Sequence, residues 1–416
     1  MTKPLTIFNS TIGRTESQGW LGCSRIVAEL EGIFAGIPYQ SLIDAILAPR
    51  IRAFSPLGRF GYPLEALLRA VIASYYLHLK STAQLVRRLQ DDPILAVTCG
   101  FDPRDIPHRT TFSRFIGKLT KYQAILDTFI ASVTSEVKAL IPEFGQIISV
   151  DSTPVRSYSN PDKKRVSDPE AAWIVKSGVG KHKEWHFGFK LHMAVDSNLE
   201  LPIAKKFTLA QASDTQTMLP LLEEAKQQMS WFSPDVIIAD KGYDSGYNYR
   251  GVVDEFGASP VIPLSARSKG TMPELTGSSS KPCCPAGLTL VYRSKDKRKG
   301  RQYQCPDRAG KADCPMTEKC GLKMVWLNPE QDYRRFGYMV KRGTDEWTKI
   351  YHKRSASERV FSRLKQTRRL EEHCFRGFDR LNTHTTLSIL TMQALALAKA
   401  KAGRVDDIRG CVRQVG

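Results

Sequence analysis

No run of apolar residues in this sequence is long enough to cross a bilayer. The longest, residues 387–398 (LSILTMQALALA), is 12 residues long, whereas a membrane-spanning helix needs about 20. The first residues, MTKPLTIF, also lack the apolar segment of a secretory signal. We therefore expect a protein with no membrane partner that stays in the cytoplasm.

Acidic residues are in short supply. Only 42 Asp and Glu oppose 61 Lys and Arg among 416 residues, which leaves a net charge of +19. This excess creates an attractive field for polyanions, and nucleic acid is the leading partner; a generally basic proteome or a ribosome-associated surface are the alternatives. The length predicts two or three domains with real cores, and excludes a disulfide-stapled miniprotein or a disordered tail.

Cysteine is also scarce, and its number, nine, is odd. This is a poor disulfide set for a cytoplasmic chain. Five of the nine crowd into one segment: Cys283, Cys284, Cys305, Cys314 and Cys320. A four-thiolate structural zinc site would suit a small insert without much core, but the spacing is not that of paired CxxC motifs. Zinc binding and free thiols both stay open.

The first third of the chain has helical periodicity. Apolar residues recur at three- and four-residue spacing from Pro63 to about Leu79, and shorter helices are expected from Ser81 and from Thr110 or Thr111. Short helices separated by turns, the last with basic residues, resemble a helix-turn-helix DNA reader. A plain helical bundle is the alternative. We assign residues 1–50 to an N-terminal segment and 51–140 to a helical, DNA-binding domain.

From residue 141 the pattern changes to that of a mixed sheet. The β-branched run 147–150 leads to Asp151, with a loop expected beyond it, and 186–195 alternates as a half-buried strand next to a strand at 201–209. A helix from Ser213 or Asp214 then precedes the run 236–239, which is apolar on both faces and ends at Asp240. A helix from about Ser245 and a strand near 260–263 complete the order β-β-β-α-β-α-β.

The remainder divides into three parts. Residues 264–340 are rich in Ser, Gly, Lys and Pro, contain the five clustered cysteines, and are predicted to be an insertion. Residues 341–402 are helical and basic, and we assign them to the second part of the core defined by 141–263. Residues 403–416 form a C-terminal tail.

A polar stripe marks the basic helical segment. If 351–365 is one helix, Tyr351, Arg354, Glu358 and Lys365 lie within an arc of about 60°. Apolar residues beside the stripe would anchor the helix to a core, so that the stripe faces a cleft. A solvated face with an ordinary Arg-Glu pair is the alternative.

Three carboxylates in this pattern point to metal chemistry. Asp151 and Asp240 each end an apolar run, where a carboxylate is costly unless it meets a cation. Together with Glu358 they form a set of hard oxygen ligands suited to two Mg²⁺ (or Mn²⁺) ions, which support in-line phosphoryl displacement. Ten Lys and Arg lie between 341 and 369 and could hold a DNA backbone; those beside the stripe are Arg359, Arg363, Arg368 and Arg369.

The motifs resemble those of one family. Tyr351, Arg354, Glu358 and Lys365 reproduce the Y-x2-R-x3-E-x6-K signature of DDE transposases of bacterial insertion sequences. The segments ISVDSTPV and IIADKGYDS look like the other two acidic motifs, GFKLH resembles the strand that joins them, and residues 54–119 are similar to a helical N-terminal domain found in part of the family.

The resemblance implies an α/β, RNase H-like catalytic core with a helical N-terminal domain and an insertion between the second Asp and the Glu. It implies that Asp151, Asp240 and Glu358 bind metal and that Tyr351, Arg354 and Lys365 contact DNA near the cleaved end. The expected enzyme binds terminal inverted repeats as a homodimer at the nucleoid, cuts DNA and transfers the strand to target DNA. A non-catalytic DNA-binding regulator and an RNase H-like nuclease without strand transfer are the alternatives.

Overall fold

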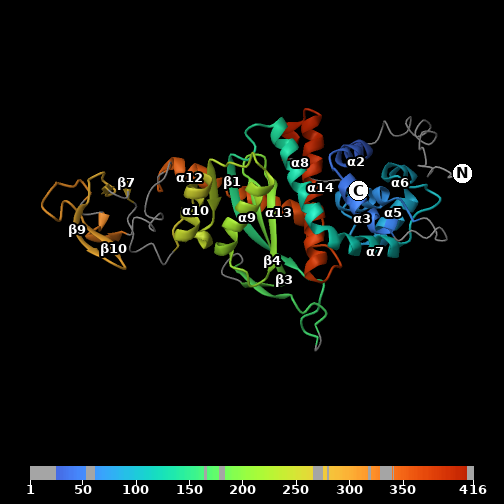
Figure 1. Cartoon of the computed structure of the whole chain (residues 1–416), viewed down its shortest axis with the longest axis horizontal. Coiled ribbons are helices and arrows are strands. Elements are labelled where there is room, and N and C mark those ends of the chain that lie inside the picture. Colours follow the sequence, from blue (N-terminus) through green and yellow to red (C-terminus); the bar gives the residue numbers. More distant parts are fainter. Residues whose placement is uncertain are drawn as a thin grey trace.

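The computed structural model describes residues 25–52, 61–163, 166–177, 183–265, 275–278, 281–316, 320–327, 340 and 342–409. Figure 1 shows an elongated molecule with N-terminal helices at one end, a sheet in the middle and a small all-β unit at the other end. Within the described ranges, no helix has both the length and the apolar character that crossing a bilayer requires.

The described part of the chain begins with helices that lead to the sheet. They are α2 (Arg25–Ala35), α3 (Gln40–Arg52), α4 (Leu64–Tyr76), α5 (Thr82–Asp91), α6 (Pro93–Cys99), α7 (Arg109–Leu119), η1 (Thr120–Tyr122) and α8 (Gln123–Leu140). The expected start of a helix at Ser81 is confirmed, because its side chain accepts a hydrogen bond from the backbone N–H of Gln84 at 3.2 Å. The helix expected from Thr110 or Thr111 starts slightly earlier, with His108 as its N-cap.

The central sheet is mixed, as predicted. Its strands are β1 (Ile147–Arg156), β2 (Ala172–Ser177), β3 (Lys183–Asp196), β4 (Leu201–Leu209), β5 (Val236–Ala239) and β6 (Ser259–Val261). The order is β2-β3-β1-β5-β6, with β4 also paired to β3. Pairs β1–β5 and β5–β6 are parallel, and β1–β3, β2–β3 and β3–β4 are antiparallel. Helices α9 (Asp214–Gln228) and α10 (Gly246–Phe256) supply the crossovers.

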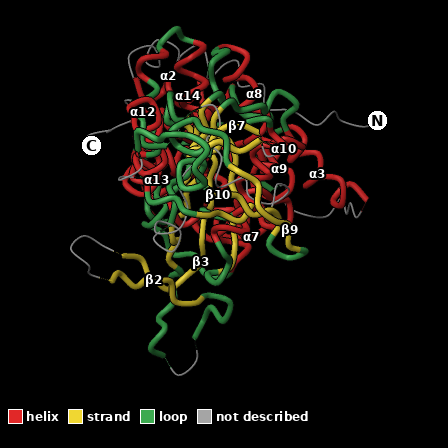
Figure 2. The backbone as a smooth tube through the Cα atoms, turned by 90° about the vertical axis from the view of Figure 1, so that its left-hand side faces the viewer, coloured by secondary structure: helices red, strands yellow, loops and turns green. Residues whose placement is uncertain are grey.

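Two features of the sheet differ from expectation. The loop expected directly after Asp151 is wrong, because β1 continues to Arg156 through its antiparallel pairing with β3. Strand β2 was not expected; it pairs with the first half of β3 and extends away from the body (Figure 2). In both cases the partner β3 is longer than its alternating segment indicated.

A glycine allows β1 and β3 to approach each other. Gly188 lies opposite Arg156, and a Cβ atom there would be 2.0 Å from the carbonyl oxygen of Val155. No side chain fits at that distance. The glycine of the GFKLH segment is therefore required by backbone packing next to the strand that carries Asp151.

Helices cover both faces of the sheet. Successive side chains of β1 point to opposite faces, and Asp151 meets Ser357 of α13 (Ser355–Thr367), whereas Ser152 meets Asp214 of α9. Therefore α13 and α9 lie on opposite faces. Helix α14 (Phe378–Lys401) shares the face of α13, because Phe378 packs against Phe189, which is paired with Val155.

One hydrophobic core connects the N-terminal helices with the sheet. It runs without interruption from Leu30 of α2 through α4 and α8 to the strands, α13 and α14, and it ends at Ile408. Helix α14 lies beside α8 between the two regions (Figure 1). It packs so closely on α2 that a Cβ at Gly32 would be 2.8 Å from that of Ala398. The helical and sheet regions therefore share their interior.

The small β unit has its own core. Its strands are β7 (Thr276–Ser278), β8 (Lys281–Cys283), β9 (Val291–Asp296), β10 (Gly300–Gln304) and β11 (Met324–Leu327). A separate cluster that includes Leu290, Tyr303 and Leu327 is buried there. After it, the chain returns to the sheet through α12 (Asp345–His352) and ends its described part with η5 (Val405–Asp407).

Replacing Gly188 with Ala is expected to destabilise the protein by about 1–3 kcal/mol or more, because a methyl group has to displace the backbone of β1. Urea unfolding measures the change. Gly61→Ala is the matched control, since no atom lies within 4 Å of its Cβ position. Equal stability of the Gly188 variant and the wild type would contradict this packing.

Acid is expected to destabilise the fold through buried histidines. Burial, followed by the charge of Arg369, lowers the pKa of His373 to about 4. The unfolded chain, with a histidine pKa of about 6.5, therefore binds a proton between pH 6.5 and 4 that the folded chain does not bind. The free energy of unfolding should fall by up to about 1.4 kcal/mol per pH unit from this group as the pH drops through that window.

His373→Asn should remove this part of the pH dependence, measured by urea unfolding at several pH values. His352→Asn is the control, since that side chain is exposed. An unchanged slope in the His373 variant would contradict the assignment.

Candidate active site

Two aspartates follow the last paired residues of the parallel strands β1 and β5. Val150 of β1 is paired with Ala239 of β5, so the next residues, Asp151 and Asp240, follow at the same level on neighbouring strands. Such strands are about 4.8 Å apart. Two carboxylates brought this close repel each other unless a cation or hydrogen-bond donors compensate them.

Local donors hold both carboxylates. Oδ1 of Asp240 accepts a hydrogen bond from the N–H of Gly242 at 2.7 Å, and a Cβ at Gly242 would be 2.9 Å from that oxygen. Oδ1 of Asp151 accepts from the N–H of Ser152 at 2.8 Å, and its Oδ2 accepts from the hydroxyl of Ser357 at 3.4 Å. Backbone N–H groups thus hold both carboxylates, and helix α13 also holds Asp151 through Ser357.

Glu358 joins this pair through an arginine. Arg354 places Nη2 2.6 Å from Oε1 of Glu358 and Nη1 3.7 Å from Oδ2 of Asp151. Burial lowers the pKa of Arg354, but the hydrogen bond and charge of Glu358 outweigh burial and raise it above its usual value. The guanidinium therefore lies between the first and third acidic residues as their counter-ion.

The predicted single helix over 351–365 is wrong. Helix α12 ends at His352 and α13 begins at Ser355. Between them the i→i+4 ladder is replaced by i→i+3 hydrogen bonds, such as that from the N–H of Ala356 to the carbonyl of Lys353 at 3.0 Å. The break exists because the two helices pack on different surfaces: α12 on the end of β6, and α13 on β1 and β3.

The other two residues of the stripe, Tyr351 and Lys365, have different surroundings. Tyr351 stacks on Trp347 with ring centroids 4.9 Å apart. Burial raises the pKa of Tyr351, and the negative charge of Asp240 adds to this effect, so its hydroxyl lies within the field of that carboxylate. Lys365, at the far end of α13, forms an ion pair with Glu371 at 2.6 Å. The anchoring residues Val360 and Leu364 are fully buried, as predicted.

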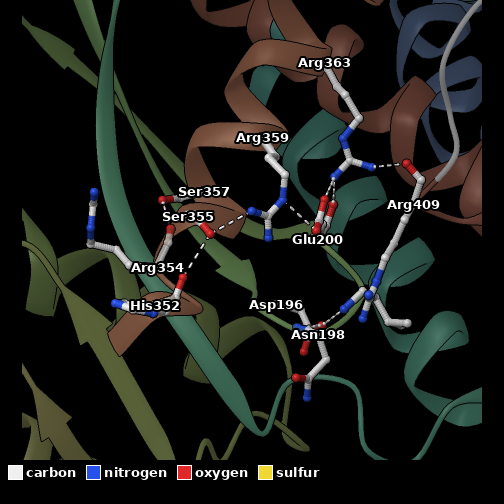
Figure 3. A network of polar contacts seen from close by, with 11 residues as sticks. Asp196, Asn198, Glu200, His352, Arg354, Ser355, Ser357, Arg359, Arg363 and Arg409 are labelled. Atoms are coloured by element: carbon white, nitrogen blue, oxygen red, sulfur yellow. Dashed lines mark hydrogen bonds and ion pairs between the residues drawn. The ribbon is translucent and has the colours of Figure 1, made fainter. Parts of the chain in front are cut away.

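Two further arginines of α13 hold the helix against the sheet. Arg359 and Arg363 both bind Glu200 in the turn between β3 and β4, with N–O distances of 2.8 and 3.1 Å (Figure 3). Arg363 is 7% exposed and also donates to the backbone carbonyls of Glu200 and Arg409. The expectation that Arg363 contacts DNA therefore needs correction: its guanidinium is enclosed. Arg359 remains half exposed.

Arg368 and Arg369 are also interior residues, each 5% exposed. Arg369 donates to the hydroxyl of Ser74 at 2.8 Å and lies over the ring of Tyr75, so it connects the segment after α13 to α4. Arg368 lies over the ring of Tyr76. Their expected role in DNA contact is thus also corrected, because burial on folding leaves neither guanidinium exposed to a ligand.

Sequence reasoning missed several residues of the site. Tyr243 is 2% exposed, and burial, followed by the charges of Asp151, Asp214 and Asp240, raises its pKa well above the ordinary value. Its position three residues after the second aspartate was a signal that could have been used. Ser357 precedes Glu358 directly, but only tertiary packing shows that it binds Asp151.

The five clustered cysteines, for which zinc binding and free thiols were both open, have different surroundings. Cys284 is buried in the apolar core of the β unit, and Cys320 packs against that core. Cys314 accepts a hydrogen bond from the N–H of Met316 at 3.4 Å. In the described ranges, no group of three or more His, Cys, Asp or Glu side chains is arranged to hold a metal ion. This finding covers the five cysteines and also the three acidic residues of the site.

The fold and site define an RNase H-like core with acidic residues on adjacent central strands and on a covering helix. Residues 142–393 match the family "Transposase DDE domain", and residues 30–118 match "Transposase domain (DUF772)". The chain belongs to the DDE transposase family. A structure of piggyBac transposase, in a synaptic complex with hairpin DNA, is 12% identical over 92% of this chain and 78% of that one, with a TM-score of 0.39.

Proposed function

We propose that this protein is a DNA transposase that binds the terminal inverted repeats of its element, hydrolyses the phosphodiester bond at each end and joins the freed 3′-hydroxyl to target DNA. The observation that carries the proposal is the register of β1 and β5, which makes Asp151 and Asp240 neighbours, with Glu358 linked to Asp151 through Arg354. Family membership supports the same reaction class.

The donor set fits Mg²⁺ or Mn²⁺. Carboxylate oxygens are the ligands that these ions prefer. Asp151 and Asp240 follow paired residues of β1 and β5, and Glu358 is linked to Asp151 through Arg354, although the three side chains are not gathered around one ion position in the described structure. When bound, two such ions activate the attacking water or hydroxyl and neutralise the leaving oxygen. Arg354 now compensates the acids, so its guanidinium has to leave Asp151 and Glu358 before they act as ligands.

The exposed cations of this edge have a separate role in the proposal. Arg354, once released, and the half-exposed Arg359 lie next to the acids and can hold the phosphates that flank the scissile bond. Tyr351 and Lys365 extend this surface along α12 and α13. Two protomers would bridge two element ends, as the family resemblance implies.

Removing one acid is expected to abolish cleavage while DNA binding persists. Asp151→Asn, Asp240→Asn and Glu358→Gln should each lower the rate of cleavage of a duplex containing the inverted repeats by about 10²-fold or more. A gel assay with Mg²⁺ measures nicked and joined products. Glu136→Gln is the control, since this acid pairs with Lys401 away from the site. Wild-type rates in all three variants would refute the proposal.

Removing Arg354 is expected to strengthen metal binding by the DNA-free protein. Arg354→Gln removes a positive charge that competes with the ion, so the affinity for Mn²⁺ should rise at least about fivefold. Electron paramagnetic resonance of free Mn²⁺ measures the affinity without catalysis. Arg359→Gln makes the same charge change on the same helix but at Glu200, and should have little effect. Equal or weaker binding by the Arg354 variant would contradict this competition.

A further inference from the structure

A basic groove lies on the side of the N-terminal helices, away from the acidic residues. Its hollow measures about 690 Å³ and is formed by α7, η1 and the first turn of α14. Four of its lining side chains are basic, namely Arg114, Lys118, Lys121 and Arg380, and no carboxylate lines it. Four positive charges around one hollow repel each other unless an anion joins them.

The groove differs in its pairing from the arginines of α13. Arg359 and Arg363 each bind Glu200. By contrast, no ion pair within the described ranges involves Arg114, Lys121 or Arg380, and all three are exposed. Ion pairs therefore account for the charges of Arg359 and Arg363 but not for those of Arg114, Lys121 and Arg380.

Tertiary packing builds this groove. Arg380 is 259 residues beyond Lys121 (380 − 121), and the contact of α14 with α7 and η1 brings the two together. Gly117, in the last turn of α7, lies against it. A Cβ there would be 3.4 Å from Nη2 of Arg380, an ordinary contact distance, so only a side chain longer than alanine would have to displace the guanidinium.

We propose that this groove binds the phosphate backbone of duplex DNA and that it holds the DNA in a fixed position relative to the catalytic sheet. Lysine and arginine side chains that line an open groove are better suited to contact phosphate groups than to read base edges. The same α14 that supplies Arg380 begins at Phe378, which packs on Phe189 of β3 and Phe207 of β4. DNA bound here is thus connected rigidly to the sheet that carries Asp151. The proposal rests on the proposed function only in taking DNA as the polyanion.

The salt dependence of DNA binding tests the groove. Affinity for a 40-base-pair duplex is measured by fluorescence anisotropy in EDTA from about 50 to 300 mM salt. The wild type is compared with the groove triple variant, Arg114→Gln/Lys121→Gln/Arg380→Gln. The control is a second triple variant, Lys226→Gln/Lys311→Gln/Lys323→Gln, whose lysines are exposed elsewhere on the protein. Loss of three phosphate contacts should lower the slope of log K against log salt by about 2–3 and the affinity at 0.1 M salt about tenfold or more. The control should change the slope by less than about 1.

A charge-neutral variant tests the shape of the groove. Gly117→Leu displaces Arg380 without changing net charge, and leucine favours a helix more than glycine does, so α7 should persist. Its affinity for the same duplex should fall at least about threefold, with unchanged circular dichroism. Equal losses of DNA affinity in the groove triple variant and its control would overturn the proposal. Wild-type affinity in the groove triple variant or in Gly117→Leu would overturn it as well.

The outcomes separate this site from the proposed function. If the groove variants bind DNA like the wild type while the acidic variants lose cleavage, the groove is rejected and the transposase proposal stands. If the groove variants lose duplex binding but wild-type protein neither cleaves nor joins repeat DNA, the groove stands and the catalytic proposal fails.

Discussion

The parallel pairing of β1 with β5 is the constraint on which the site depends. It places two carboxylates on neighbouring strands at one level, and their mutual repulsion has to be compensated. The surrounding elements do this in turn: the N–H groups of Ser152 and Gly242 donate to the aspartates, and Arg354 supplies a positive charge. The third acid, Glu358, is the partner of that arginine, so one guanidinium connects acidic residues from distant parts of the chain.

Helix α13 has to be held in place for this arrangement to exist. Apolar packing by Val360 and Leu364 fixes the distance of the helix from the sheet. The ion pairs of Arg359 and Arg363 with Glu200 fix its direction. An arginine with a buried head is destabilising unless its donors are satisfied. Arg363 meets this condition at its two terminal nitrogens, which donate to backbone and carboxylate oxygens. Residues that look like a DNA-binding stripe in the sequence therefore serve partly to hold the helix in place.

Much of the fold was predictable because its strands are apolar runs and its helices have clear periodicity. The segments before Asp151 and Asp240, the order of the elements along the chain apart from β2, and the helix from Ser245 all follow from local pattern. The continuation of β1 to Arg156, strand β2 and the break at Lys353 did not, because each depends on a partner surface and not on its own residues. Among the basic residues, charge alone could not distinguish Arg354, at the acids, from Arg369, enclosed beneath α4. The acidic set itself stays a prediction in its catalytic role.

The uninterrupted hydrophobic core affects when the protein can fold during its synthesis. Helix α2, near the beginning of the described chain, completes its packing only against Ala398 near the end. Because domains synthesised on a ribosome fold as units once their parts have emerged, the early helices have to wait with exposed apolar surfaces until the last long helix arrives. Assembly of the protein is thus tied to completion of translation, and a polypeptide terminated before residue 358 would lack Glu358 as well as the helices that pack on the sheet beside Asp151.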